Sequence, residues 1–102
     1  MKHLKMIYMY KKKPNKFLGQ HFLQSKKILD SIINAADIKE SDIVLEVGPG
    51  KGVLTKELLK RAKKVVAVEK DPILAQSLAK NLKNPSKLKV FRGDILGLNP
   101  KK

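Results

Sequence analysis

The chain lacks cysteine and tryptophan, and only nine acidic residues stand against 23 lysines and arginines. Without cysteine the sequence can form neither a disulfide nor a thiolate zinc site, and we expect no bound metal. No apolar run approaches the roughly 18 residues of a membrane span. The first ten residues are interrupted by Lys2 and Lys5, which argues against a signal peptide. We therefore expect a cytoplasmic protein that does not associate with membranes.

The formal net charge of +14 comes from 21 lysines and two arginines. A surface of this kind attracts polyanions, and nucleic acid binding by counterion release would make the affinity strongly dependent on salt. The alternative is a lysine-rich surface that only keeps the protein soluble, with no polyanionic partner.

A chain of 102 residues forms at most one domain. Residues 1–16 are predicted to be a basic arm, and residues 1–12 to be a frayed terminus, because the first 29 residues hold eight lysines and no acid. From residue 17 we expect a folded domain to which Phe17, Leu18, Phe22 and Leu23 anchor the arm.

The apolar pattern predicts helices that alternate with short strands. Helices are expected over residues 25–36 and 53–62 and from Pro72 onward, where Asp71 is the predicted N-cap. Strands are expected over residues 43–47, 65–68 and 88–91. Strands separated by helices pair in parallel with right-handed crossovers, so the predicted fold is an α/β sheet of three parallel strands.

Three glycines, Gly48, Gly50 and Gly52, follow the first of these strands. They either form a plain turn or let a ligand approach the backbone closely. The segment is not a Walker phosphate loop, and Val53 and Thr55 stand where a dinucleotide fingerprint would need its third glycine. Nicotinamide and flavin cofactors are thereby disfavoured.

Acidic residues lie at the ends of all three predicted strands, where open α/β sheets bind ligands. Glu69 can accept hydrogen bonds from both hydroxyls of a ribose, or it can be an ordinary surface charge beside Lys70. Asp94 can accept from an amine such as N6 of adenine, or it can cap the following turn. Glu46 can face a cation or accept backbone N–H bonds from the glycine loop. Together these groups suit a nucleoside with a zwitterionic end.

Four segments resemble the ribosomal RNA adenine dimethyltransferase family: Phe-Leu-Gly-Gln-His-Phe-Leu (17–23), Leu-Glu-Val-Gly-Pro-Gly-Lys-Gly-Val-Leu-Thr (45–55), Val-Glu-Lys-Asp (68–71) and Gly-Asp-Ile-Leu (93–96). The resemblance implies a Rossmann-like class I methyltransferase fold and S-adenosylmethionine as the cofactor. It implies that the cofactor contacts are His21, Leu23, Gly48 and Gly50 of the glycine loop, Glu69 and Asp94.

The resemblance also implies transfer of methyl groups to N6 of two adjacent adenosines near the 3′ end of small-subunit rRNA. The expected partner is that rRNA or the pre-ribosomal small subunit, and the full-length enzyme is expected to be monomeric. The family's Asn-Leu-Pro-Tyr-like motif, which grips the target adenine, is absent, and Leu98-Asn99-Pro100 does not replace it. We therefore assign no catalytic residue, and we expect the chain to be a cofactor-binding half, truncated after the third strand and inactive alone.

Two other functions remain open on the sequence. A non-catalytic RNA-binding module that keeps the methyltransferase fold would account equally well for the charge. A nucleotide-dependent oxidoreductase half-domain fits less well, because the dinucleotide fingerprint is incomplete.

Overall fold

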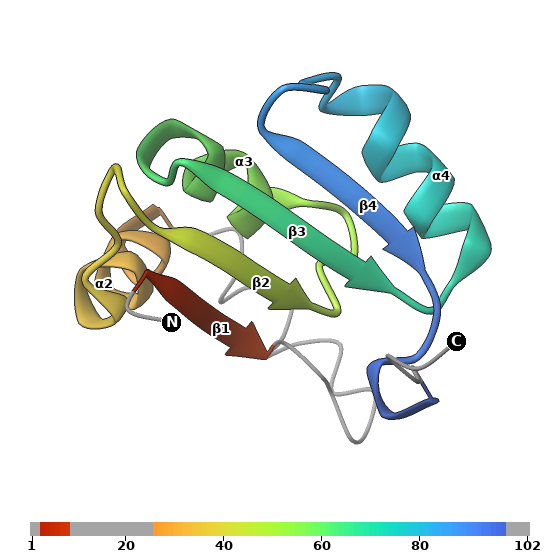
Figure 1. Ribbon diagram of the computed structural model, residues 1–102, viewed down its shortest axis with the longest axis horizontal. Coiled ribbons are helices and arrows are strands. Elements are labelled where there is room, and N and C mark those ends of the chain that lie inside the picture. The colour runs from red at the N-terminus through yellow and green to blue at the C-terminus, as the bar shows by residue number, and fades with distance from the viewer. Residues whose placement is uncertain (1–2, 9–25, 98–102) are drawn as a thin grey trace.

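The computed structural model describes residues 3–8 and 26–97, which form a parallel sheet with helices. Its elements are β1 (Leu4–Tyr8), α2 (Lys26–Ala36), β2 (Ile43–Val47), α3 (Val53–Arg61), β3 (Lys64–Glu69), α4 (Pro72–Asn81), β4 (Leu88–Arg92) and the 3-10 turn η1 (Ile95–Gly97). The strands lie in the order β1-β2-β3-β4, and every neighbouring pair is parallel. Figure 1 shows the four arrows side by side and pointing the same way.

The predicted α/β fold is confirmed, and the three predicted strands are β2, β3 and β4. The predicted start of α4 is also correct. The Asp71 carboxylate accepts hydrogen bonds from the N–H groups of Ile73 (2.8 Å) and Leu74 (3.2 Å), and Pro72 occupies the first turn. This is the capping arrangement that an acid followed by proline favours.

The structure differs from the sequence prediction at the amino terminus. Residues 1–16 were predicted to be a basic arm outside the domain, with residues 1–12 frayed, but Leu4–Tyr8 form an edge strand that pairs in parallel with β2. The pairing begins where the N–H of Ile43 donates to the carbonyl of His3, at 2.7 Å. The sheet therefore has four strands where the sequence predicted three. Residues 9–25, with the predicted anchors Phe17 to Leu23, lie outside the described residues.

A buried carboxylate explains why this lysine-containing segment joins the sheet. Lys5 Nζ lies 3.2 Å from Asp42 Oδ2 and also donates to the carbonyl of Ala36 at 3.1 Å. Asp42 is only 2% exposed, and its pKa is held below the usual range, mainly by the hydrogen bond from the Lys39 N–H and further by Lys5. Ile7 packs against the core. The many lysines near the amino terminus led to the prediction of a basic arm, and the strand pattern of Leu4–Tyr8 was not recognised.

All three described helices cover the same face of the sheet. The residues of β2 and β3 that point to this face include Val44 and Val65, which are fully buried against α2 and α3. In Figure 1 the arrows of β2 and β3 stand in front of α3. The core cluster consists of Leu29, Ile33, Val44, Leu54, Leu58, Leu59, Ala62 and Val65. The opposite face carries large apolar side chains that are about half exposed, namely Leu4, Met6, Tyr8 and Phe91.

None of the described helices is both long and apolar enough to span a membrane. Within the described residues, no three His, Asp or Glu side chains lie close enough together to hold a metal ion.

Candidate functional site

The carboxyl ends of β2, β3 and β4 meet at one edge of the sheet, as parallel pairing requires. The backbone N–H of Gly48 donates to the carbonyl of Val68 (2.9 Å), and that of Gly93 donates to the carbonyl of Glu69 (2.9 Å). These two bonds extend the ladders past the strand ends. They hold the glycine loop, Glu69 and the turn after β4 next to one another.

The glycine loop makes a tight turn whose glycines adopt left-handed backbone angles. The φ values are 76° at Gly48, 59° at Gly50 and 86° at Gly52. A Cβ built on Gly50 would meet no atom of the described residues within 4 Å, whereas one on Gly52 would lie 2.4 Å from Cδ1 of Leu78. Gly50 therefore faces open space, which leaves its backbone accessible to a ligand, while Gly52 lets α3 and α4 pack closely.

Glu69 is not a solvated surface charge, because it is 6% exposed and both of its carboxylate oxygens accept backbone hydrogen bonds. The N–H of Gly50 donates to Oε1 at 2.9 Å, and the N–H of Asp71 donates to Oε2 at 2.9 Å. A carboxylate oxygen has two lone pairs, so each oxygen can accept one further bond. Glu69 thus joins the glycine loop to the start of α4 and still has acceptor capacity.

Glu46 is fully buried and faces α3 instead of an open cleft. Its Oε1 accepts a hydrogen bond from the Thr55 hydroxyl (2.5 Å), and its Oε2, also shut off from solvent, has no hydrogen-bond partner among the described residues. Burial raises the pKa of Glu46 to about 7, the Thr55 hydrogen bond opposes this rise, and the charge of Glu69 adds to it. The sequence alternatives for Glu46 were a cation or a backbone N–H, and within residues 3–8 and 26–97 neither is its partner. Thr55, which lies in the first turn of α3, was not among the site residues predicted from the sequence.

Asp94 is exposed at the end of the turn that follows β4. Its Oδ1 accepts the N–H of Leu96 at 2.9 Å, which caps the 3-10 turn η1. Of the two sequence interpretations, the structure shows the turn cap, and it leaves the carboxylate open to solvent for a ligand amine.

The structure thus brings together four of the six predicted site residues, Gly48, Gly50, Glu69 and Asp94. The other two, His21 and Leu23, lie outside the described residues. The assembled site lies at the carboxyl edge of the sheet and comprises an open glycine turn and two carboxylates. It can accept hydrogen bonds from hydroxyl and amino groups, which suits a nucleoside better than a polyphosphate.

Comparisons with known proteins point to one family. A sequence model of the family described as "Ribosomal RNA adenine dimethylase" matches residues 11–102. The chain is 48% identical over 95 residues to the ribosomal RNA small subunit methyltransferase A of Dehalococcoides mccartyi, covering 93% of this chain and 33% of that protein. It is 45% identical over 85 residues to the dimethyladenosine transferase of Schizosaccharomyces pombe, covering 80% of this chain and 28% of that protein. The chain therefore spans about a third of the length of these curated relatives.

Solved structures give the same result. The crystal structure of a dimethyladenosine transferase from Plasmodium falciparum matches with a TM-score of 0.66 and 41% identity, over 76% of this chain and 29% of that chain. The crystal structure of the 23S rRNA methyltransferase ErmE matches with a TM-score of 0.69 and 40% identity, over 78% of this chain and 32% of that chain. The resemblance carried by the sequence motifs is confirmed: this chain has a Rossmann-like methyltransferase fold and belongs to the ribosomal RNA adenine dimethylase family.

Proposed function

We propose that this chain is the cofactor-binding part of an rRNA adenine N6,N6-dimethyltransferase that uses S-adenosylmethionine. The observation that carries the proposal is the buried Glu69 carboxylate, fixed to the Gly50 N–H at the point where three strand ends meet. We propose that this carboxylate holds the sugar of the nucleoside cofactor. The chain spans about a third of the length of its curated relatives. The methyl-transfer reaction of a whole protein of this family is therefore proposed here and not observed.

The residues present fit S-adenosylmethionine. Glu69 has free lone pairs for the ribose hydroxyls, and the exposed Asp94 carboxylate can accept the adenine amine. The open space beside Gly50 allows the methionine part to approach the backbone from Gly48 onward. His21 and Leu23 are proposed to complete the pocket.

When bound, S-adenosylmethionine supplies a methyl group on a positively charged sulfur. The part of the chain described here contributes binding and orientation, and positioning of this kind can lower a barrier substantially without any residue of the chain reacting. We propose that the acceptors are the N6 amines of two adjacent adenosines near the 3′ end of small-subunit rRNA. A target base would have to leave its stack to reach the cleft.

The names of the relatives support the substrate class, because they describe a ribosomal RNA small subunit methyltransferase and a dimethyladenosine transferase. We propose that the full-length enzyme acts as a monomer in the cytoplasm on small-subunit rRNA, free or in the pre-ribosomal small subunit. A non-catalytic RNA-binding module with the same fold is the second candidate, and the net charge of +14 favours it equally.

Binding and transfer experiments on the chain itself test this proposal. We expect titration calorimetry to detect binding of S-adenosylmethionine and no binding of NAD. We expect no incorporation of labelled methyl groups into small-subunit rRNA, because the motif that grips the target adenine is missing from these 102 residues. Preference for NAD would overturn the cofactor assignment. Methyl transfer by the chain alone would show that the acceptor site is already complete, while RNA binding without any cofactor binding would favour the second candidate.

Replacing Glu69 with alanine should weaken binding of S-adenosylmethionine by about 1–3 kcal/mol, because two ribose hydroxyls lose their acceptor. Glu40→Ala is the matched control, since Glu40 is exposed and its loss changes the net charge equally. Glu69 also holds two backbone N–H groups, so circular dichroism must first show that the variant is folded. Equal affinity of the folded Glu69→Ala and Glu40→Ala variants, measured by calorimetry, would contradict the assigned role.

A further inference from the structure

The outer edge of the sheet, formed by α4, the loop after it and β4, carries charged residues of positive sign only. From Pro72 to Gly93 the sequence contains five cations and not one Asp or Glu. We call these five residues the basic edge: Lys80, Lys83, Lys87, Lys89 and Arg92.

Four of the five cations of the basic edge form no ion pair with the described residues, whereas several cations near α2 and α3 do. Near α2 and α3 the structure pairs Lys5 with Asp42, Lys60 with Glu57, and Arg61 with Asp30. Lys87 is held by α3, because its Nζ donates to the carbonyl of Leu59 at 2.6 Å. The remaining four residues of the basic edge form no ion pair within the part of the chain that the structure describes. Their charge is therefore available to an external anion.

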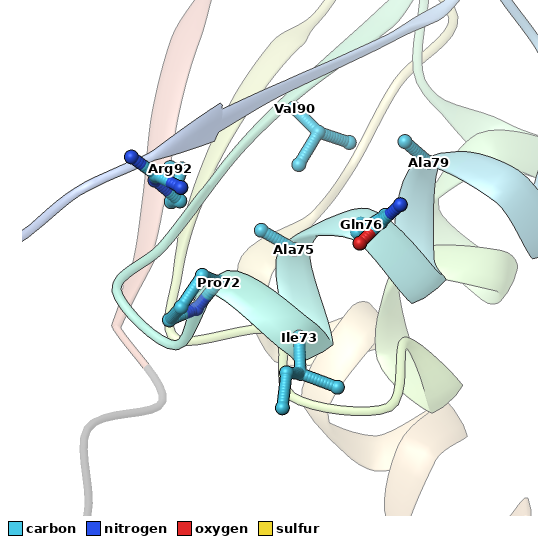
Figure 2. A pocket seen from close by; sticks show the side chains of 7 residues that line it. All are labelled: Pro72, Ile73, Ala75, Gln76, Ala79, Val90 and Arg92. Atoms are coloured by element: carbon cyan, nitrogen blue, oxygen red, sulfur yellow. The ribbon is translucent and has the colours of Figure 1, made fainter.

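A groove of about 460 Å³ runs between α4 and β4 on this edge. Figure 2 shows Arg92 above Pro72 at one end, and Val90 above Ala75 farther along the strand. The floor is aliphatic, and Gln76 adds an exposed amide that can donate to and accept from a base edge. A volume of this size lies within the range of small-ligand sites, so a single nucleotide can enter.

Arg92 connects the groove with the candidate cofactor cleft. It is the register partner of Glu69 on the neighbouring strand, which places the two backbones about 5 Å apart. Arg92 is exposed, and its guanidinium presents paired donors of the kind that match a phosphate. A phosphate held by Arg92 would thus lie at the border of the cleft, with its base toward the aliphatic floor.

We propose that the basic edge binds a single-stranded segment of the RNA substrate, with one nucleotide in the α4–β4 groove. Arg92, Lys80 and Lys83 contact phosphates, and Val90 and Gln76 contact the base. This inference rests on the proposed function for the identity of the polyanion. Phosphate contacts of this kind fix the position of a nucleic acid on a protein without reading its sequence. The basic edge would therefore hold the RNA beside the donor site.

Fluorescence anisotropy with a labelled single-stranded RNA of about 10 nucleotides tests the charge contacts. The variant Lys83→Ala with Arg92→Ala removes two cations of the basic edge. The control, Lys27→Ala with Lys56→Ala, removes two exposed cations from α2 and α3. Loss of two phosphate contacts should weaken binding ~25-fold at ~0.1 M salt and flatten the slope of log K against log salt by about 1.4. The control should change both quantities far less, and an equal effect of the two double variants would overturn the proposal.

A second variant tests the α4–β4 groove separately from the cations of the basic edge. Ala79 is exposed and lines the groove, so Ala79→Phe should fill it and weaken RNA binding several-fold while the salt slope stays unchanged. RNA affinity equal to that of the wild type, in a variant shown to be folded by circular dichroism, would exclude the groove. S-adenosylmethionine binding by the wild type is measured in parallel. Its failure would contradict the proposed function, whereas failure of the RNA results alone would contradict only this inference.

Discussion

Gly52→Ala is expected to destabilise the fold by roughly 2–4 kcal/mol, a large share of the stability of a small domain. The new Cβ would lie 2.4 Å from Cδ1 of Leu78 and 3.1 Å from Cδ1 of Leu82. Leu78 is 2% exposed and has little room to move away. The residue would also have to keep a φ of 86°, which side chains disfavour. Urea denaturation followed by circular dichroism measures the loss.

Gly50→Ala is the matched control for that experiment. Its φ of 59° imposes a similar backbone cost, but its Cβ would meet nothing within 4 Å. We therefore expect a loss of about 1 kcal/mol, from the backbone alone. If both variants lose the same free energy of unfolding, the close packing of α4 against Gly52 contributes nothing to the cost of the Gly52→Ala substitution.

The second large effect is a dependence of stability on pH that comes from Glu46. Its pKa is about 7 in the folded chain against an ordinary value of 4.5, so between these pH values the folded state holds a proton that the unfolded state has released. Raising the pH through this window therefore lowers the free energy of unfolding, by roughly 3 kcal/mol in total. Below the window this stabilisation is fully present, and above pH 7 it is lost.

Glu46→Gln should remove this pH dependence. A glutamine cannot ionise, and its amide oxygen can still accept the hydrogen bond that Thr55 donates to Glu46. Urea denaturation across the window from 4.5 to 7 should show the wild type losing stability relative to the variant. The hydrogen bond from the Thr55 hydroxyl lowers the pKa of Glu46. The substitution Thr55→Val should therefore move the loss of stability to higher pH. Parallel stability curves for the wild type and Glu46→Gln would show that Glu46 does not titrate in this range.

Most of the sheet could be predicted because its strands are short apolar runs separated by helical patterns. Val44 and Val65 are fully buried. Buried strands are apolar, and this made β2 and β3 predictable from the sequence. β1 was not predicted, because a lysine interrupts its apolar pattern. Lys5 in that strand is held by Asp42, which lies far along the chain, and a single sequence does not show such a distant partner.

The site residues were predictable as a set because parallel strands bring their carboxyl ends together. Their individual contacts were not. The sequence placed Glu46 among the groups facing a ligand, yet the structure buries it against Thr55 on the helical face of the sheet. Whether a carboxylate at a strand end faces the cleft or the core depends on how α3 packs, which is a property of the folded chain.

The two backbone bonds accepted by Glu69 bear on the entropy of ligand binding. Fixing the backbone of one flexible residue costs about 1–2 kcal/mol of conformational entropy. Because Glu69 already holds the N–H groups of Gly50 and Asp71, the loop and the start of α4 lose this freedom when the chain folds. A ligand that binds beside the glycine loop meets a preorganised backbone, and more of its contact energy remains as affinity.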